Sequence, residues 1–394
     1  MNPDATALDI LRQLIAIPSV NPNFTQPEDL QGEHRVAAIV AGILEDLGFV
    51  IDSLPTESKH CNLVARRGPA QPRFTLTFEA HLDTVGVKGM EIAPFAAEVR
   101  GGRVWGRGAS DDKGPLAALL AALGGAKLQD LEPRGIEIKV IGAIREESGN
   151  EGAELLRNTG FETDWLVVLE PTELNVIVAH KGAFWFRIDV FGSAAHGSCP
   201  DQGLNAIEGM MEVIRELKLR VAVAARRISG SDLGSPTLNI GTIQGGSSLN
   251  IVAPSCGIEV DRRTLPGEEP DELEREMRAV LEAQVERGII RSWSLQVIKS
   301  RPPFLGSPHT PLVRALENAA GAVGHPIGEQ TVSWYSDAGV LSPCSRNTVV
   351  FGPGSISEAH TSRESISIDQ LSAGTAVLRR FIEELPEAFP AAGQ

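Results

Sequence analysis

Hydrophobic positions in the first part of the chain follow helical and strand spacings in turn. Leu8, Leu11, Leu14 and Ile15 recur at helical spacing and stop before Pro18, which predicts an amphipathic helix. Further helices are expected over residues 36–47 and 113–128, and strands over residues 62–66, 73–79, 135–144 and 164–169. This alternation predicts an α/β layer with a mainly parallel sheet and helices on both faces.

The pattern changes after residue 181. The apolar spacing over residues 182–298 predicts a strand, a helix, two strands, a helix and a strand in that order. This is the order of a ferredoxin-like α+β sandwich. The six elements are expected over residues 184–190, 204–217, 237–243, 257–263, 268–287 and 292–298.

A helix over residues 310–323, a strand over 348–351 and a helix over 369–385 return to the first pattern, while 221–235 and 306–309 are expected as loops. The prediction is therefore a catalytic domain in two parts, residues 1–181 and 299–394, around an inserted domain, residues 182–298.

Composition narrows the class of protein. A length of 394 residues favours two domains over one. The formal charge of -15 argues against nucleic acid and anionic membranes as partners. No apolar run approaches the roughly 20 residues of a membrane span. The start of the chain lacks a basic stretch followed by an apolar one, so no signal peptide is expected. Four scattered cysteines are then expected as reduced thiols in a cytoplasmic protein.

Acidic residues and histidines follow several of the expected strands. In open α/β sheets the ligand site lies beyond the carboxyl ends of the strands. Two histidines, three carboxylates and one spare glutamate would satisfy two divalent zinc ions and a catalytic base, because imidazole nitrogen and carboxylate oxygen are the ligands of catalytic zinc. These side chains are His81, Asp111, Glu146, Glu147, Glu170 and His360.

Glu146 and Glu147 are neighbours, and on a regular strand they would face opposite ways. Both can reach one site only if the strand has already ended, and the sequence Ser148-Gly149-Asn150 supplies such an ending.

Each candidate also has a purely structural interpretation. His81 alone could be an ordinary buried histidine, Asp83 a helix cap and Glu146 a solvated loop acid. His196 could close a turn beside Gly197, and the segment Tyr335-Ser336-Asp337 could line a pocket or begin a helix. A small-molecule binding protein without turnover is a further alternative, but binding alone needs no base such as Glu146.

The ordered set resembles the dinuclear zinc amidohydrolase and peptidase family, which includes acetylornithine deacetylase, succinyl-diaminopimelate desuccinylase, the aminoacylases and glutamate carboxypeptidase. The likeness extends over nearly the whole chain. The segment Gly352-Pro353-Gly354-Ser355-Ile356-Ser357-Glu358-Ala359-His360 is similar to the acetylornithine deacetylase version. Family membership would place the protein in amino-acid metabolism.

The resemblance implies a role for each candidate. Asp111 would bridge two zinc ions, for which cobalt or manganese can substitute. Glu146 would be the general base, and Asp83 would fix the tautomer of His81. His196 matches a histidine that reaches the active site, often from the partner subunit. The ligands of the first zinc would be His81, Asp111 and Glu170, and those of the second Asp111, Glu147 and His360.

The implied reaction is hydrolysis of the amide bond of an N-acyl-L-amino acid by a hydroxide between the two zinc ions. Asn250 and Arg263 match family positions that hold the substrate carboxylate, for which the planar guanidinium is suited. A homodimer through the inserted domain is expected. Deacetylation of acetylornithine is the first expectation, with a desuccinylase, a general aminoacylase, and a dipeptidase or carboxypeptidase as alternatives.

The chain departs from the family at Asp112, where an uncharged residue is more common after the bridging aspartate. The family also tends to have a cis peptide at this bond. Asp112 is expected either to tune the metal or to face solvent.

Overall fold

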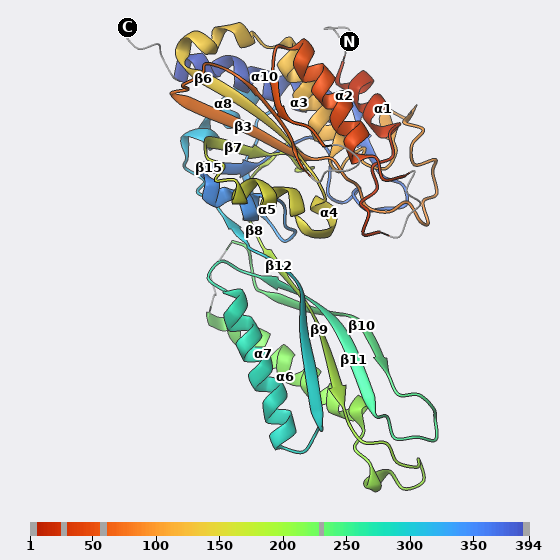
Figure 1. Cartoon of the computed structure of the whole chain (residues 1–394). Helices are drawn as coiled ribbons and strands as arrows, with labels where there is room; N and C mark the ends of the chain where they lie inside the picture. Colours follow the sequence, from red (N-terminus) through yellow and green to blue (C-terminus); the bar gives the residue numbers. More distant parts are fainter. Residues whose placement is uncertain (1–5, 25–29, 56–60, 228–231, 389–394) are drawn as a thin grey trace. The chain divides into compact units, whose positions relative to one another are not determined.

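The computed structural model describes residues 6–24, 30–55, 61–227 and 232–388. Its contacts divide the chain into two compact units (Figure 1). The first unit contains residues 1–179, 306–330 and 336–394, and the second contains residues 180–305 and 331–335. The domain boundaries predicted at residues 181 and 298 stay a prediction.

A mainly parallel sheet forms the centre of the first unit, as predicted. Its parallel strands are β6 (Ile136–Ala143), β3 (Phe74–His81), β7 (Thr163–Val168) and β15 (Ser345–Val350), adjacent in that order. All eight residues of β3 are buried, although the polar residues Thr75, Thr77 and Glu79 alternate with apolar ones along its sequence.

Antiparallel strands flank this parallel group on both sides. β2 (Leu63–Arg67) pairs with β6, β1 (Val50–Ser53) pairs with β2, and β8 (Val176–His180) pairs with β15. The sheet therefore follows the order β1-β2-β6-β3-β7-β15-β8.

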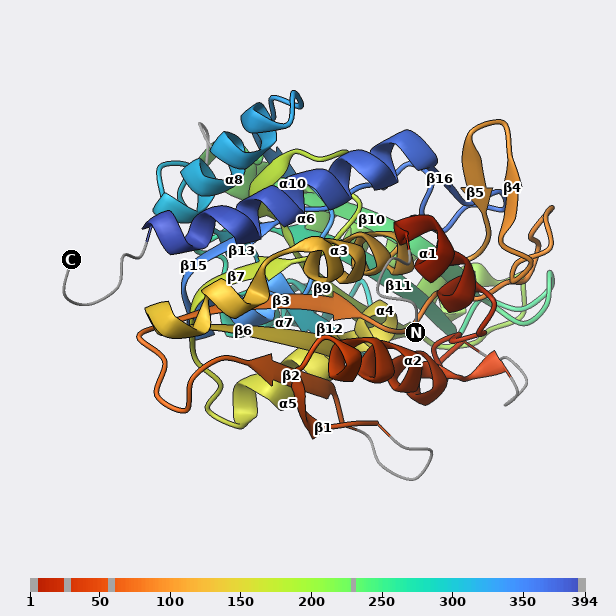
Figure 2. The same ribbon diagram turned by 90° about the horizontal axis from the view of Figure 1, so that it is seen from above.

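Helices cover both faces of the sheet, with α1, α2, α3 and α10 on one side and α4 and α5 on the other (Figure 1). α10 packs against α3 and α8, and α3 packs against α1 (Figure 2). Their bounds are α1 Ala7–Ile15, α2 Glu33–Asp46, α3 Lys113–Gly125, α4 Glu146–Gly149, α5 Glu151–Asn158, α8 Pro311–Ala322, α9 Ala338–Leu341 and α10 Ile368–Ala388.

Hydrogen bonds from single side chains fix the first helix. Thr6 and Asp9 form a reciprocal capping box at the start of α1. At the other end, the fully buried ammonium of Lys113 donates to the carbonyl oxygens of Leu14 (3.0 Å) and Ile17 (2.8 Å). α1 is thereby tied to the first residue of α3, directly beside the Asp111 loop.

A small antiparallel sheet lies between the Asp111 loop and the C-terminal segment. It consists of β4 (Glu98–Arg100), β5 (Arg103–Trp105) and β16 (Ser365–Ser367), in the order β16-β5-β4. Two further short strands are β13 (Phe304–Leu305) and β14 (Glu329–Val332).

The second unit has the predicted ferredoxin-like order. Its strands are β9 (Gly182–Phe191), β10 (Thr237–Gly245), β11 (Ser255–Thr264) and β12 (Ser292–Arg301), in the antiparallel order β10-β11-β9-β12. The helices α6 (Ala206–Arg227) and α7 (Pro270–Glu286) lie on one face of this sheet (Figure 1). Alternate residues of β9, including Phe184 and Phe186, are buried in the core shared with these helices.

One predicted loop is wrong. Residues 221–227, expected as loop, continue helix α6 to Arg227, while residues 228–231 lie outside the described residues. The buried stripe of Met210, Val213 and Leu217 continues to Val221 at helical spacing. The alanine-rich sequence beyond it has high helix propensity. The predicted loop at residues 306–309 is confirmed.

All four cysteines are free thiols. Among helices of the described residues, none combines the length and apolar character needed to cross a membrane.

Candidate metal centre and catalytic site

Several candidate side chains of the first unit lie at or just after the ends of strands. His81 is the last residue of β3 and pairs with Ala143, the last residue of β6. Arg145 then adopts a left-handed conformation (φ 55°), so the strand has ended before α4 begins at Glu146. Glu146 and Glu147 therefore lie on a helical turn, where neighbouring side chains can reach one region.

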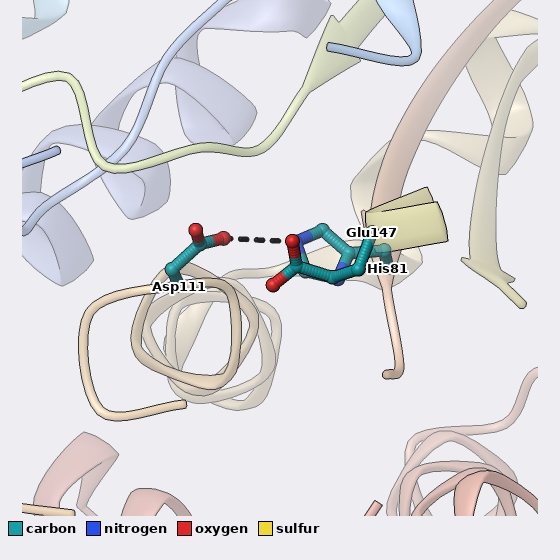
Figure 3. Close-up of side chains that lie close together, drawn as sticks. All are labelled: His81, Asp111 and Glu147. Carbon is teal, nitrogen blue, oxygen red and sulfur yellow. Dashed lines mark hydrogen bonds and ion pairs between the residues drawn. The ribbon is translucent and has the colours of Figure 1, made fainter. Parts of the chain in front are cut away.

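Three of these side chains offer ligand atoms to a common point (Figure 3). One atom each of His81, Asp111 and Glu147 lies within 4.8 Å of the others. Nε2 of His81 is 2.9 Å from Oδ1 of Asp111. On the other side, Nε2 of His360 is 3.3 Å from Oδ2 of Asp111 and 3.0 Å from Oε2 of Glu147. Asp111 thus lies between two imidazoles, with one carboxylate oxygen toward each.

Glu170 follows β7 and is 5% exposed. Burial raises its pKa, and the charge of Asp111 raises it further. Glu170 is not within the 4.8 Å group, which makes it a neighbour of the cluster rather than a member.

Asp83 connects the His81 segment with the Glu146 turn. Its Oδ1 and Oδ2 accept the backbone N–H groups of Glu146 (3.0 Å) and Glu147 (3.1 Å). Asn21 donates to Oδ2 at 2.7 Å. Nδ1 of His81 lies 3.1 Å from the backbone oxygen of Asp83 and 3.4 Å from Oδ1. Asp83 therefore contacts His81 more closely through its backbone oxygen than through its carboxylate, and its carboxylate holds the backbone of both glutamates.

Glu146 points into a different set of contacts from Glu147. Its Oε1 accepts a hydrogen bond from Nδ2 of Asn150 at 2.9 Å, and the same amide donates to Asp337 at 2.8 Å. Burial raises the pKa of Glu146, with the charge of Asp337 as the next cause. Asp337 precedes the short helix α9, which agrees with the interpretation of its segment as the start of a helix, and its buried side chain contacts Asn150.

Sequence reasoning missed the residue that holds the Asp111 loop. Glu364 accepts the backbone N–H groups of Gly108 (3.0 Å), Ser110 (2.9 Å) and Asp111 (3.1 Å). It also accepts a hydrogen bond from Arg107 at 2.6 Å. About 250 residues separate Glu364 from this loop, and no local pattern in the sequence links the two. The contact of Asn21 with Asp83, 62 residues away, and that of Asn150 with Asp337, 187 residues away, were missed for the same reason.

Asp112 does not face solvent. Its side chain is fully buried, and neither carboxylate oxygen has a hydrogen-bond partner among the described residues. Burial raises its pKa. The peptide bond between Asp111 and Asp112 is cis, as expected.

The chemistry of this cluster fits divalent metal ions. Burial raises the pKa of Glu146, Glu147 and Glu170, and neighbouring carboxylates raise each further. Burial opposes protonation of His81, but the Asp111 and Asp83 carboxylates outweigh it and raise its pKa. Several buried anions around two imidazoles form an oxygen and nitrogen donor set that cations would neutralise.

The second unit holds the remaining three candidates, at two ends of its sheet. Gly197 donates to the backbone oxygen of Asn250 at 2.8 Å, which brings the His196 and Asn250 loops together. Both loops adjoin the end of the sheet where Ser255 pairs with Phe191. Arg263 lies near the opposite end of β11, roughly 25–30 Å along the strand. It forms an ion pair with Asp261 (3.0 Å) and lies over the ring of Tyr335, 5.4 Å from its centroid.

Within one chain, therefore, the loops of His196 and Asn250 lie side by side, whereas Arg263 lies far from both.

Comparison with known families gives one match over most of the chain. Residues 77–384 match the model of peptidase family M20/M25/M40. Acetylornithine deacetylase of Edwardsiella ictaluri is 30% identical over 385 residues, which cover 95% of this chain and 96% of that protein. Acetylornithine deacetylase of Salmonella typhimurium is 31% identical over 364 residues, which cover 90% and 91% of the two chains.

Solved structures share the fold over nearly the full length. An M20 family metallo-carboxypeptidase from Sulfolobus solfataricus superposes with a TM-score of 0.79 at 20% identity, covering 97% of this chain and 100% of that one. Aminopeptidase PepT from Bacillus cereus superposes with a TM-score of 0.75 at 22% identity, covering 96% and 98%. A Bacillus subtilis protein described as a dinuclear metal-binding peptidase of family M20 has a TM-score of 0.71 at 15% identity, covering 97% and 98%.

Proposed function

The chain belongs to peptidase family M20/M25/M40, and from that premise we propose that it hydrolyses the amide bond of an N-acyl-L-amino acid, with N-acetylornithine as its substrate. It is an enzyme of the metallopeptidase or amidohydrolase type. The observation that carries the proposal is the position of Asp111 between His81 and His360, with Glu146 beside the cluster but in separate contacts. The acetyl group and the ornithine side chain are proposed from the two deacetylase relatives.

Two metal ions are proposed at this cluster, with zinc as the expected metal. His81 and Glu170 would hold one ion, Glu147 and His360 would hold the other, and Asp111 would bind both. When bound, such ions lower the pKa of a water molecule and polarise a carbonyl group.

Glu146 is proposed to move the protons of the reaction. It accepts a proton from the attacking water, whose oxygen bonds to the amide carbon. The C–N bond then breaks, and Glu146 delivers the same proton to the leaving amine nitrogen. Asn150 holds one oxygen of Glu146, which leaves the other for this transfer. Asp83 fixes the turn from which Glu146 projects.

Residues of the second unit are proposed to bind the substrate. His196 would donate a hydrogen bond to the oxyanion that develops on the substrate carbonyl. Asn250 and Arg263 would hold the substrate carboxylate. Because His196 and Asn250 lie at one end of the sheet and Arg263 near the other, we propose that the first two serve the site of a partner subunit.

The outer surface of the second unit supports a homodimer. β10 lies at the edge of its sheet and pairs with β11 alone among the strands of the described residues. Exposed apolar side chains recur along α6 at Ile207, Met211, Leu219 and Val223, and Met211 is 63% exposed. An open strand edge beside an apolar helix is a common basis for association of two identical chains.

A substrate panel tests the proposed reaction. Metal-loaded protein is assayed for amine release from N-acetyl amino acids, including acetylornithine, from N-succinyl amino acids and from dipeptides, with Glu146→Gln as the inactive control. Preferred turnover of acetylornithine is expected. Preference for a succinyl substrate or a dipeptide would replace the proposed substrate within the same family, and no release from any amide would overturn the proposed function.

Mixing two inactive variants tests the partner-subunit role. Glu146→Gln and His196→Ala are each expected to be inactive, but exchange of subunits would place an intact Glu146 and an intact His196 at one shared site. Recovery of activity is therefore expected after mixing. No recovery, with subunit exchange demonstrated by two differently labelled chains, would place His196 outside the partner's site.

A further inference from the structure

Two hydrogen bonds converge on one ring nitrogen of His196. The hydroxyl oxygen of Ser198 lies 2.7 Å from Nδ1 of His196. The backbone N–H of Ser198 donates to the same Nδ1, with a nitrogen–nitrogen distance of 3.2 Å. A backbone N–H can only donate, so Nδ1 must present its lone pair to it. Nδ1 therefore carries no proton, and in the neutral ring the proton lies on Nε2.

We propose that Ser198 is a positioning residue that holds His196 as the tautomer with its proton on Nε2, ready to donate a hydrogen bond. A donor is what an oxyanion requires. The opposite tautomer would present a lone pair to the developing negative charge and would repel it. The catalytic consequence rests on the proposed function of His196, whereas the tautomer itself does not.

The backbone around the ring is held independently of the serine hydroxyl. His196 forms an isolated bridge with Ile251, and Cys199 N–H closes a turn onto the backbone oxygen of His196 at 2.9 Å. A Cβ at Gly197 would approach backbone atoms of Asn250 to 3.0–3.1 Å, so the turn fits closely against the Asn250 loop. The ring thus projects from a fixed backbone, and Ser198 needs to set only its rotation and protonation.

The Ser198 hydroxyl can donate to Nδ1 while it accepts from another group. Sγ of Cys199 lies 3.6 Å from Oγ of Ser198. In this arrangement the Cys199 thiol donates a hydrogen bond to the Ser198 hydroxyl, and the hydroxyl donates to Nδ1 of His196. Each donor then has an acceptor, and Nδ1 needs no proton.

The experiment measures the tautomer directly by ¹⁵N NMR of the full-length protein with labelled histidine. Spectra are recorded at about pH 8.5, roughly two units above the pKa of an ordinary imidazole. The signals of His196 are assigned by their loss in His196→Gln. The expected wild-type spectrum has an unprotonated Nδ1 and a protonated Nε2.

Ser198→Ala retains only the longer bond from the backbone N–H. The two nitrogen signals should move toward each other as the tautomers begin to exchange, and Ser198→Thr, which keeps the hydroxyl, should restore the wild-type spectrum. In the metal-loaded enzyme, kcat of Ser198→Ala should fall between about two- and tenfold, the effect of one hydrogen bond, with KM little changed. Ser292→Ala, at an exposed serine at the start of β12, is the control and should alter neither property.

A wild-type spectrum with the proton on Nδ1 would overturn the proposal, whatever the activity. It would also be overturned if Ser198→Ala left both the spectrum and kcat unchanged. If Ser198→Ala shifts the spectrum as expected while His196→Ala retains full turnover, the positioning by Ser198 stands and the proposed catalytic role of His196 fails.

Discussion

Adjacent carboxylates with different surroundings are the main feature of this site at the scale of single residues. Glu146 and Glu147 share the anchor Asp83 through their backbone N–H groups. Their side chains then separate, because Glu146 bonds to Asn150 whereas Glu147 contacts His360. The local environment, rather than the residue type, therefore separates the two glutamates, and the different roles proposed for them rest on this difference.

This difference predicts opposite results for two matched variants. Glu146→Gln should retain the metal content of the wild type and lose about 10²–10⁴ in kcat, because it removes a general base. Glu147→Gln should lose metal, because it removes a carboxylate oxygen from the cluster. Elemental analysis together with turnover measures both properties. If Glu146→Gln lost metal and Glu147→Gln kept it, the two roles would have to be exchanged.

The buried imidazole of His180, which is not among the proposed metal ligands, leads to a predicted pH dependence of stability. Burial lowers its pKa to about 4, and its Nδ1–H donates to the backbone oxygen of Lys181 at 2.9 Å. Above about pH 6.5 the histidine is neutral in both the folded and the unfolded states. As the pH falls from 6.5 toward 4, only the unfolded state gains the proton, so folding is destabilised by about 2 kcal/mol at pH 5.

The variant His180→Asn keeps an N–H donor for this carbonyl and removes the titrating group. Its free energy of unfolding should therefore fall less between pH 7 and pH 5 than that of the wild type, measured in denaturant titrations. An equal fall in both proteins would mean that His180 is accessible to protons in the folded state.

At the scale of elements, two segments far apart in the chain build the Asp111 loop. Glu364, just before β16, is buried with Arg107 and accepts the backbone N–H groups of the loop that precedes α3. The loop therefore depends on the C-terminal segment for its conformation.

Removal of this anchor should destabilise the protein. Glu364→Ala leaves the Arg107 charge buried without its partner, which costs about 3–5 kcal/mol of unfolding free energy. Glu358→Ala is the matched control, because Glu358 pairs with Arg103 at 3.1 Å with both side chains about one-third exposed. That change should cost less than about 1 kcal/mol. Similar losses of unfolding free energy in both variants would show that Glu364 stabilises the protein no more than an exposed ion pair does.

The elements themselves were largely predictable, because apolar spacing is a local property of the chain. His81 and Glu170 could be placed at strand ends for that reason. The anchors Asn21 and Glu364 could not, since each acts on a partner chosen by the tertiary fold. Asn150 lies only four residues from Glu146, but its second partner, Asp337, is brought to it by the fold. The extension of α6 to Arg227 was missed because the alanines and arginines of its sequence carry little apolar signal.

At the scale of the whole molecule, metal binding is expected to stabilise the first unit. Without cations, the acidic groups at its centre are close together and buried, which raises their pKa values. A ligand at a thousand times its dissociation constant contributes about 4 kcal/mol, or roughly 5 °C in melting temperature for a chain of this size.

Thorough chelation should therefore lower the melting temperature of the wild type by several degrees, and zinc should restore it at a plateau of two ions per chain. Asp111→Ala, which lacks the residue between the two histidines, should melt at the same temperature with and without chelator. A wild type insensitive to chelation would mean that these acids do not converge on a metal.

The central position of β15 bears on how the protein is made. On the ribosome, β3, β6 and β7 emerge early, but the neighbour of β7, residues 345–350, is synthesised more than 170 residues later. Residues 180–305 form most of the second unit from one continuous stretch and can fold during this interval. Until β15 and α10 arrive, β7 is an open edge and α3 lacks its packing partner α10, so the nascent first unit exposes a strand edge of the kind that chaperones protect.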